Sequence, residues 1–357
     1  MTKMASQKTK RVSKRLRLPD VLRGLAIVFM ILIHVMNLYG NAAAMSGWPY
    51  TLLDFLAGPP TGPIFMFTMG FFFMLKKPRF VPALRRGLTL ILLGYGLNIL
   101  KGFVPVFFAR EILRWDPAFF PKLYSAYYLI FEVEILIFAG LAYIAMAALS
   151  RLSDKPIFYA GVALGIALVS PWLWGIGETV PVVKHLVLPL WGADPDLAVF
   201  PFFPWAVYPI LGMATALAYK RDPHPRRLWI LSSSVGVALL VLGGGLLLLD
   251  FDRFFNDYGQ QGWGATLAFS GFIFLWGMAM KGLDSVYPER LKVGLLPYLS
   301  RNITTIYVFQ WLIIGWMFYM TPFHSLSLGW VLVCSIIVAG LSCGLTEVYN
   351  RLRKASA

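Results

Sequence analysis

Charged side chains are scarce in this chain. Only 14% of its 357 residues are Asp, Glu, Lys or Arg, whereas 58% are hydrophobic. A soluble domain carries roughly a quarter of its residues as charged side chains, so the composition excludes the soluble classes. The mean hydropathy of +0.68 points the same way. We therefore expect an integral membrane protein with the lipid bilayer as its solvent.

Cysteine is nearly absent, and so are the usual metal and phosphate motifs. Cys334 and Cys343 are separated by a spacing that puts them on opposite faces of a helix, where they cannot form a disulfide with each other. No GxxxxGK[ST], CxxC or HExxH pattern occurs, and the three histidines other than His34 fall in predicted loops. We expect no metal cofactor.

Acidic residues are also few, 17 against 32 Lys and Arg, which gives a formal net charge of +15. Such an excess of positive charge could indicate a nucleic-acid partner, but the distribution of the Lys and Arg residues along the chain argues against one. On the predicted topology, 25 of the 32 Lys and Arg fall in the terminal segments and short loops of one side. This is the bias of cytoplasmic loops in membrane proteins. We expect no nucleic acid as partner, and the sequence indicates no oligomeric state.

Ten apolar segments approach the roughly 20 residues that a spanning helix needs. They are centred on Leu22–Tyr39, Gly62–Leu75, Leu88–Phe107, Ala126–Leu149, Ile157–Trp174, Phe202–Tyr219, Leu228–Leu249, Gly264–Met280, Ile303–Met320 and Leu328–Val348. The opposite side keeps only Lys101, Arg110, Arg114, Lys122, Lys184 and Arg253. The predicted fold is an all-α, polytopic helical bundle of about ten transmembrane helices with both termini cytoplasmic. A basic tail (1–17) precedes the membrane domain (18–350), and a second cytoplasmic tail (351–357) follows it.

The first span carries an unusual polar stripe. Arg23 and His34 are separated by a near-integral number of helical turns, so they share one face at about 16 Å along the axis. Asp20 and Asn37 extend this stripe at its two ends. Arg23 paired with Asp20 could simply anchor the span at the interface. The whole stripe favours function, because ionisable groups inside a span are costly, and a histidine can act as a general base.

Two carboxylates, Glu132 and Glu134, lie in the fourth apolar segment. On one continuous helix they would point about 200° apart, so only one of them could line a given cavity. The other would then face the outer interface or pair with a cation such as Lys122. Alternatively the helix is broken there, with Glu132 in an entry turn.

The sequence resembles the transmembrane acyltransferases, namely acyltransferase family 3 and the relatives of heparan-alpha-glucosaminide N-acetyltransferase. Asp20-x-x-Arg23-Gly24 followed by His34 resembles their first span. Three further elements agree in order, and together the four span residues from about 16 to 320. They are Pro63-Ile64-Phe65-Met66-Phe67-Thr68-Met69-Gly70, then Phe200-Pro201-Phe202-Phe203-Pro204-Trp205 with Tyr208 and Gly212, and Leu299-Ser300-Arg301-Asn302 with Ile306-Tyr307-Val308.

This resemblance implies a reaction. An acyl group, expected to be acetyl, would pass from cytoplasmic acyl-CoA to a hydroxyl or amine of an extracytoplasmic acceptor such as a glycan. His34 would be the catalytic histidine, either as the base or as the acyl carrier of a ping-pong mechanism. Arg23 would meet the thioester or phosphate end of CoA, with Asp20 beside it. The loop residues Lys76, Lys77, Arg85 and Arg86 could hold the phosphates, although positive-inside charge alone also explains them.

Several polar and aromatic residues are candidate acceptor contacts. Trp205 lies near a span start and fits an interfacial belt equally well. Asn302 and Gln310 flank a common helical sector with Tyr307, where amides either line the site or join helices. Gln310 departs from the family pattern, which often has a histidine soon after this tyrosine. Together with Asn37, Glu132 and Glu134 these residues form the predicted substrate-binding set.

A transporter or flippase for a polar or lipid-linked solute is the alternative function. Broken, Gly- and Pro-rich spans with polar residues near their middle are typical of transporters. The matched interruptions in two halves that transporters often show are not found in this sequence.

Overall fold

The computed structural model describes residues 17–120, 126–192, 194, 196–222, 225–286 and 294–355. Over these residues the chain forms helices joined by loops and no β-sheet, which confirms the predicted all-α class. The helices of the first half are α2 (Arg17–Tyr39), α3 (Gly47–Ala57), α4 (Gly62–Lys76), α5 (Phe80–Asn98), η2 (Ile99–Phe103), α6 (Val104–Phe107), η3 (Phe108–Ile112), η4 (Pro117–Phe119), α7 (Ala126–Phe131), α8 (Ile135–Leu149) and α9 (Pro156–Leu173). Those of the second half are α10 (Pro181–Trp191), α11 (Phe202–Trp205), α12 (Val207–Arg221), α13 (Pro225–Leu249), α14 (Phe251–Phe255), α15 (Trp263–Val286), α16 (Leu295–Arg301), α17 (Ile303–Trp316), η5 (Met317–Tyr319) and α18 (Leu328–Ala355).

Eight helices in the described part of the chain are long and apolar enough to cross a membrane. They match eight of the ten predicted segments. The other two predicted spans coincide with α4 and α17, which have 15 and 14 residues. The last helix continues to Ala355, so most of the predicted 351–357 tail is helical. The basic tail at 1–16 lies outside the described residues.

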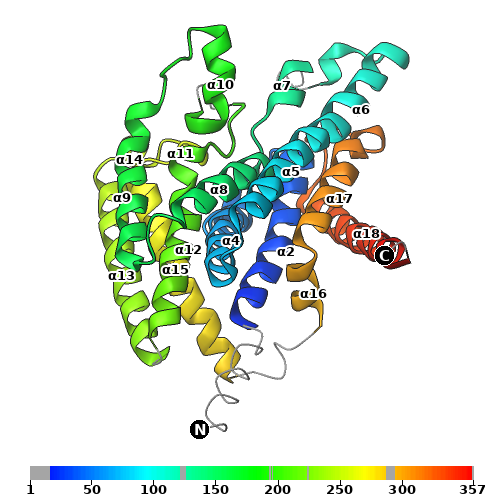
Figure 1. Cartoon of the computed structure of the whole chain (residues 1–357). Helices are drawn as coiled ribbons and strands as arrows, with labels where there is room; N and C mark the ends of the chain where they lie inside the picture. Colours follow the sequence, from blue (N-terminus) through cyan, green and yellow to red (C-terminus); the bar gives the residue numbers. More distant parts are fainter. Residues whose placement is uncertain are drawn as a thin grey trace.

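The helices lie side by side and form one bundle (Figure 1). Near the middle, α4 packs on α12 and α5 on α8, while α13 pairs with α15 and α18 with α17 towards the two sides. The short helices α7 and α10 lie at one end, and α2 begins at the opposite end.

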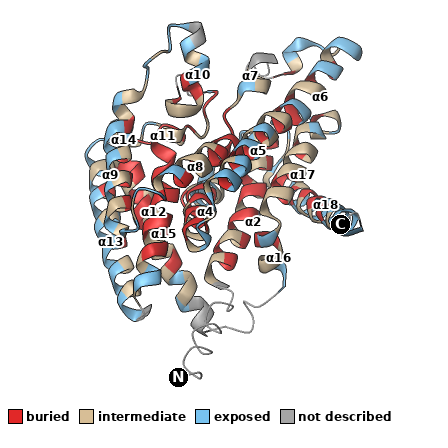
Figure 2. Ribbon diagram, in the orientation of Figure 1, coloured by how far each residue is buried: buried red, intermediate tan, exposed pale blue. Residues whose placement is uncertain are grey.

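Apolar side chains face outwards on the peripheral helices. Leu248 on α13 is 91% exposed and Ile336 on α18 is 72% exposed, and Figure 2 shows the buried residues gathered in the centre of the bundle. A soluble protein does not leave such large apolar surfaces open to water. The outward faces are therefore lipid-facing surfaces.

Small residues set the central helix crossing. A Cβ added at Gly70 of α4 would meet the backbone of Pro209, and one added at Gly212 of α12 would meet the backbone of Phe67. The two helices therefore touch backbone to backbone, as membrane helices with small residues do. Both glycines belong to the sequence elements that carry the family resemblance.

The fourth span is broken between α7 and α8. Residues 132–134 are not helical, and the backbone of Val133 pairs with the loop after α10: its N–H donates to the carbonyl of Leu197 at 2.7 Å, and its carbonyl accepts from Phe200 at 3.0 Å. Irregular backbone inside a membrane protein requires such partners. The predicted alternative of a broken helix is thus the observed one.

Candidate active site

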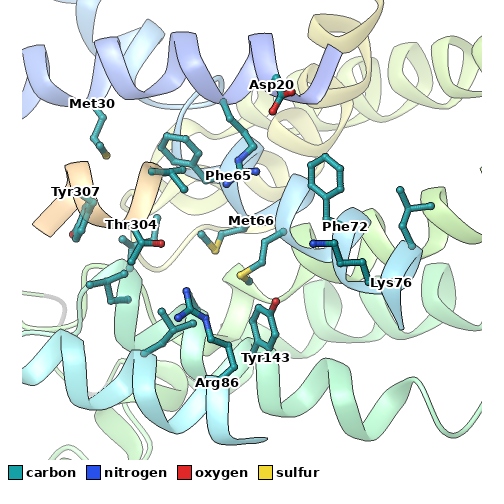
Figure 3. Close-up of a pocket in the computed structure, with 18 of the residues that line it drawn as sticks. Asp20, Met30, Phe65, Met66, Phe72, Lys76, Arg86, Tyr143, Thr304 and Tyr307 are labelled. Atoms are coloured by element: carbon teal, nitrogen blue, oxygen red, sulfur yellow. The ribbon is translucent and has the colours of Figure 1, made fainter. Parts of the chain in front are cut away.

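A cavity of about 820 Å³ opens between six helices: α2, α4, α5, α8, α12 and α17. Its apolar wall is built by Met30, Phe65, Met66, Met69, Phe72, Leu75, Leu90, Ile135, Leu136, Ala139 and Ile303. Four cations also line it, and they are Arg23, Lys76, Arg86 and Lys220. In Figure 3, Lys76 and Arg86 come from different helices, and Thr304 and Tyr307 lie on the opposite side of the view from Lys76. The size is that of a small-molecule binding site.

Only half of the predicted phosphate-binding set reaches this cavity. Lys76 and Arg86 line it, whereas their sequence neighbours Lys77 and Arg85 do not. Lys77 instead forms an ion pair with Asp154 at 2.6 Å in the loop after α8. The hydrogen bond from Lys77 holds the pKa of the Asp154 carboxyl below its usual value. In each pair of sequence neighbours, one cation lines the cavity (Lys76 or Arg86) and the other, of the same type, does not (Lys77 or Arg85).

Two members of the predicted polar stripe line the cavity as well. Asp20 is buried and accepts a hydrogen bond from the Ser300 hydroxyl of α16 at 2.8 Å. The Arg23 guanidinium lies 5.9 Å from the centre of the Phe72 ring. Both side chains therefore form part of the cavity wall that α2 contributes.

His34 lies further along the same helix, behind the cavity wall. Its Nδ1 is 3.2 Å from Nε2 of Gln310. Its ring centre is 4.3 Å from that of Trp311 and 6.5 Å from that of Tyr307. Since Tyr307 lines the cavity, the tyrosine ring connects the cavity with the histidine.

A buried lysine, Lys101, completes this network, although it was not predicted to be a site residue. Lys101, 7% exposed, forms ion pairs with Glu134 and with Glu132, the latter at 3.0 Å. Its ammonium lies 4.0 Å from the centre of the Trp311 ring. Glu134 also accepts a 2.6 Å hydrogen bond from the Tyr307 hydroxyl. The break at 132–134 lets both carboxylates face one cation, so the expectation from a continuous helix is wrong, as is the assignment of Lys101 to the outer loops.

The local backbone explains how Lys101 reaches this position. It lies on η2, a π-helical turn within the long third span. Gly315 of α17 packs directly on it, because a Cβ there would meet the carbonyl of Lys101. The indole of Trp316 donates to the neighbouring carbonyl of Leu100 at 2.9 Å. Position 101 falls inside the predicted span 88–107, and a lysine inside a span is the signal that could have identified it.

Three predicted substrate contacts lie elsewhere. Asn37 is exposed on α2 and lines no cavity identified among the described residues. Trp205 is fully buried against Tyr208 and donates to the Gly259 carbonyl at 3.0 Å, so its ring faces neither lipid nor water. Asn302 joins α16 to α18 by accepting from Asn350 at 3.0 Å.

The family comparison agrees with this arrangement. A family model described as "Acyltransferase domain", that of acyltransferase family 3, matches residues 17–346. No curated protein matches the chain. The match covers the cavity, the histidine and the buried lysine network alike. The chain belongs to the acyltransferase family 3 of transmembrane acyltransferases, and it is a membrane acyltransferase.

Proposed function

We propose that this acyltransferase moves an acetyl group from cytoplasmic acetyl-CoA to a hydroxyl or amine of a glycan on the far side of the membrane. The observation that carries the proposal is a single cavity with cations around it and a tyrosine in its wall that contacts the environment of His34.

The donor part of the proposal rests on charge and shape. CoA has phosphates at one end and a long, uncharged pantetheine arm at the other. Arg23, Lys76, Arg86 and Lys220 offer four cations to such phosphates. The wall between them and Tyr307 is rich in Met and Phe, as an uncharged arm requires. Positive-inside charge alone does not explain why Lys76 and Arg86 line one cavity.

The transfer step is assigned to His34. Its imidazole removes the proton of the acceptor hydroxyl or amine, while the acceptor oxygen or nitrogen attacks the thioester carbonyl. The new ester or amide bond forms as the carbon–sulfur bond breaks, and the departing CoA thiolate takes the proton from the His34 imidazolium. Arg23, in the cavity wall on the same helix, is placed to hold the donor.

The acceptor part rests on the second carboxylate. The Glu132 side chain is 32% exposed whereas that of Glu134 is 4% exposed. The Lys101 network therefore ends in an accessible carboxylate within the irregular segment 132–134. A carboxylate that remains accessible can accept hydrogen bonds from several hydroxyl groups. This favours a polyhydroxylated acceptor.

The test is acetyl transfer by the full chain reconstituted in lipid vesicles. Acetyl-CoA is supplied to the protein with glucosamine oligosaccharides or neutral oligosaccharides, and release of the CoA thiol is measured. We expect His34→Ala to abolish release, whereas Asn37→Ala, an exposed position one turn away on the same helix, retains it. The proposal fails if the wild-type protein neither releases thiol nor is stabilised against heat by CoA, or if His34→Ala is as active as the wild type.

A further inference from the structure

Gln310 is fully buried, and only one of the two polar atoms of its amide has a hydrogen-bond partner among the described residues. Its Nε2 faces Nδ1 of His34 at 3.2 Å, while its Oε1 has no hydrogen-bond partner among the described residues. A buried amide that served only to join two helices would be expected to bond at both ends. Among the described residues, the His34 ring is the one hydrogen-bond partner of this amide.

The chemistry of the pair depends on which amide atom meets the ring. A neutral imidazole carries one proton, on either Nδ1 or Nε2, and an amide can present an acceptor oxygen or a donor NH₂ to the same neighbour after a half-turn. If the oxygen faces Nδ1, the ring proton resides on Nδ1 and Nε2 has a free lone pair. If the NH₂ faces Nδ1, the proton resides on Nε2, which then cannot act as a base.

We propose that Gln310 is a positioning residue that sets the tautomer of His34. Its Oε1 accepts the Nδ1–H proton, so Nε2 is the atom that removes the proton from the acceptor. Since Gln310 occupies the Nδ1 side of the ring, Nε2 is the nitrogen left to meet the acceptor, and it is basic only when the ring proton lies on Nδ1. The inference rests on the proposed function, because it assigns the basic atom of the histidine proposed there. Carboxylates and amides fix catalytic histidines in this way in other enzymes.

Contacts between α2 and α17 hold His34 and Gln310 next to each other. Trp311 and Tyr307, on the same helix as Gln310, pack against the histidine ring. α17 is fixed at its far end by the Tyr39 hydroxyl of α2, which donates to the carbonyl of Ile314 at 2.7 Å. The two helices that carry His34 and Gln310 are therefore joined directly beyond the pair, so the amide can turn but cannot move away.

Charged groups near the ring bear on any pH measurement. Tyr307 faces His34 from α17, and Lys101 of η2 lies on the other side of Trp311. Glu132 and Glu134 face that lysine from the broken segment before α8. These groups are unchanged by substitution at position 310, so a shift in the pH profile would report on the histidine pair itself.

The test compares two variants of the reconstituted full chain. Gln310→Met keeps the length of the side chain and removes the acceptor, so we expect kcat to fall by about ten- to a hundredfold with the KM for acetyl-CoA unchanged. Gln310→Glu restores an acceptor, and we expect it to keep most of the wild-type kcat. Its carboxylate stabilises the imidazolium, so half-maximal kcat/KM on the acid side moves to higher pH.

Two results would overturn the inference: a Gln310→Met enzyme with kcat within twofold of wild type, or a Gln310→Glu enzyme with an unshifted pH profile. If Gln310→Met does not fold, the profile of Gln310→Glu decides. A wild-type protein that transfers no acetyl group would instead overturn the proposed function, so the two failures are distinguishable.

Discussion

The buried ion pair of Lys101 gives the sharpest prediction about stability. The Lys101 and Glu134 side chains are 8% and 4% exposed, so neither can be hydrated in place of its partner. Lys101→Met keeps the aliphatic bulk and leaves the Glu134 carboxylate buried without a cation. Breaking a buried pair from one side costs about 3–5 kcal/mol.

Heat denaturation of the ligand-free protein in detergent measures this cost. At about 2 °C per kcal/mol, as for large domains, Lys101→Met should lower Tm by roughly 6–10 °C. The matched control is Lys77→Met, whose pair with Asp154 is 42% and 66% exposed and should change Tm little. The double variant Lys101→Met with Glu134→Gln removes the uncompensated charge and should recover most of the loss. A Tm for Lys101→Met within 2 °C of wild type (roughly 1 kcal/mol) would refute the buried-pair argument.

Two further predictions concern close packing and surface charge. Gly315→Ala should destabilise the protein by about 1–3 kcal/mol, because the new methyl meets the Lys101 carbonyl, whereas Gly96→Ala, with open space around it, should be neutral or stabilising in the same Tm assay. Asp154→Asn should lower Tm slightly at neutral pH, because the charged carboxyl is favoured in the folded protein. This difference should fade as the pH falls through the lowered pKa of Asp154, and a difference that grew on acidification would contradict the assignment.

The fold could be predicted from hydropathy and charge because lipid imposes simple rules on helix length and loop charge. The break in the helix at 132–134 could not be predicted from hydropathy and charge. Its backbone partners, Leu197 and Phe200, come from a distant loop, and no local pattern reports that pairing. The helical spacing argument applied to Glu132 and Glu134 failed for this reason.

The site was predictable only where one helix carries it. Arg23 and Asp20 share a face of α2, and the structure puts both into the cavity wall. Gln310 could not be assigned from spacing, because its contact with His34 depends on how α17 crosses α2. Lys76 and Lys77, or Arg85 and Arg86, are chemically equivalent in the sequence, and only the packing of α4 and α5 separates them.

That separation provides the most direct test of a donor site in the cavity. The double variants Lys76→Gln with Arg86→Gln, and Lys77→Gln with Arg85→Gln, lose the same charge from the same stretch of the chain, between the end of α4 and the first turns of α5. The Kd for acetyl-CoA, measured by titration of the purified proteins, should rise about tenfold or more for the first variant and stay near wild type for the second. Equal Kd values for the two variants would contradict binding of the donor in this cavity.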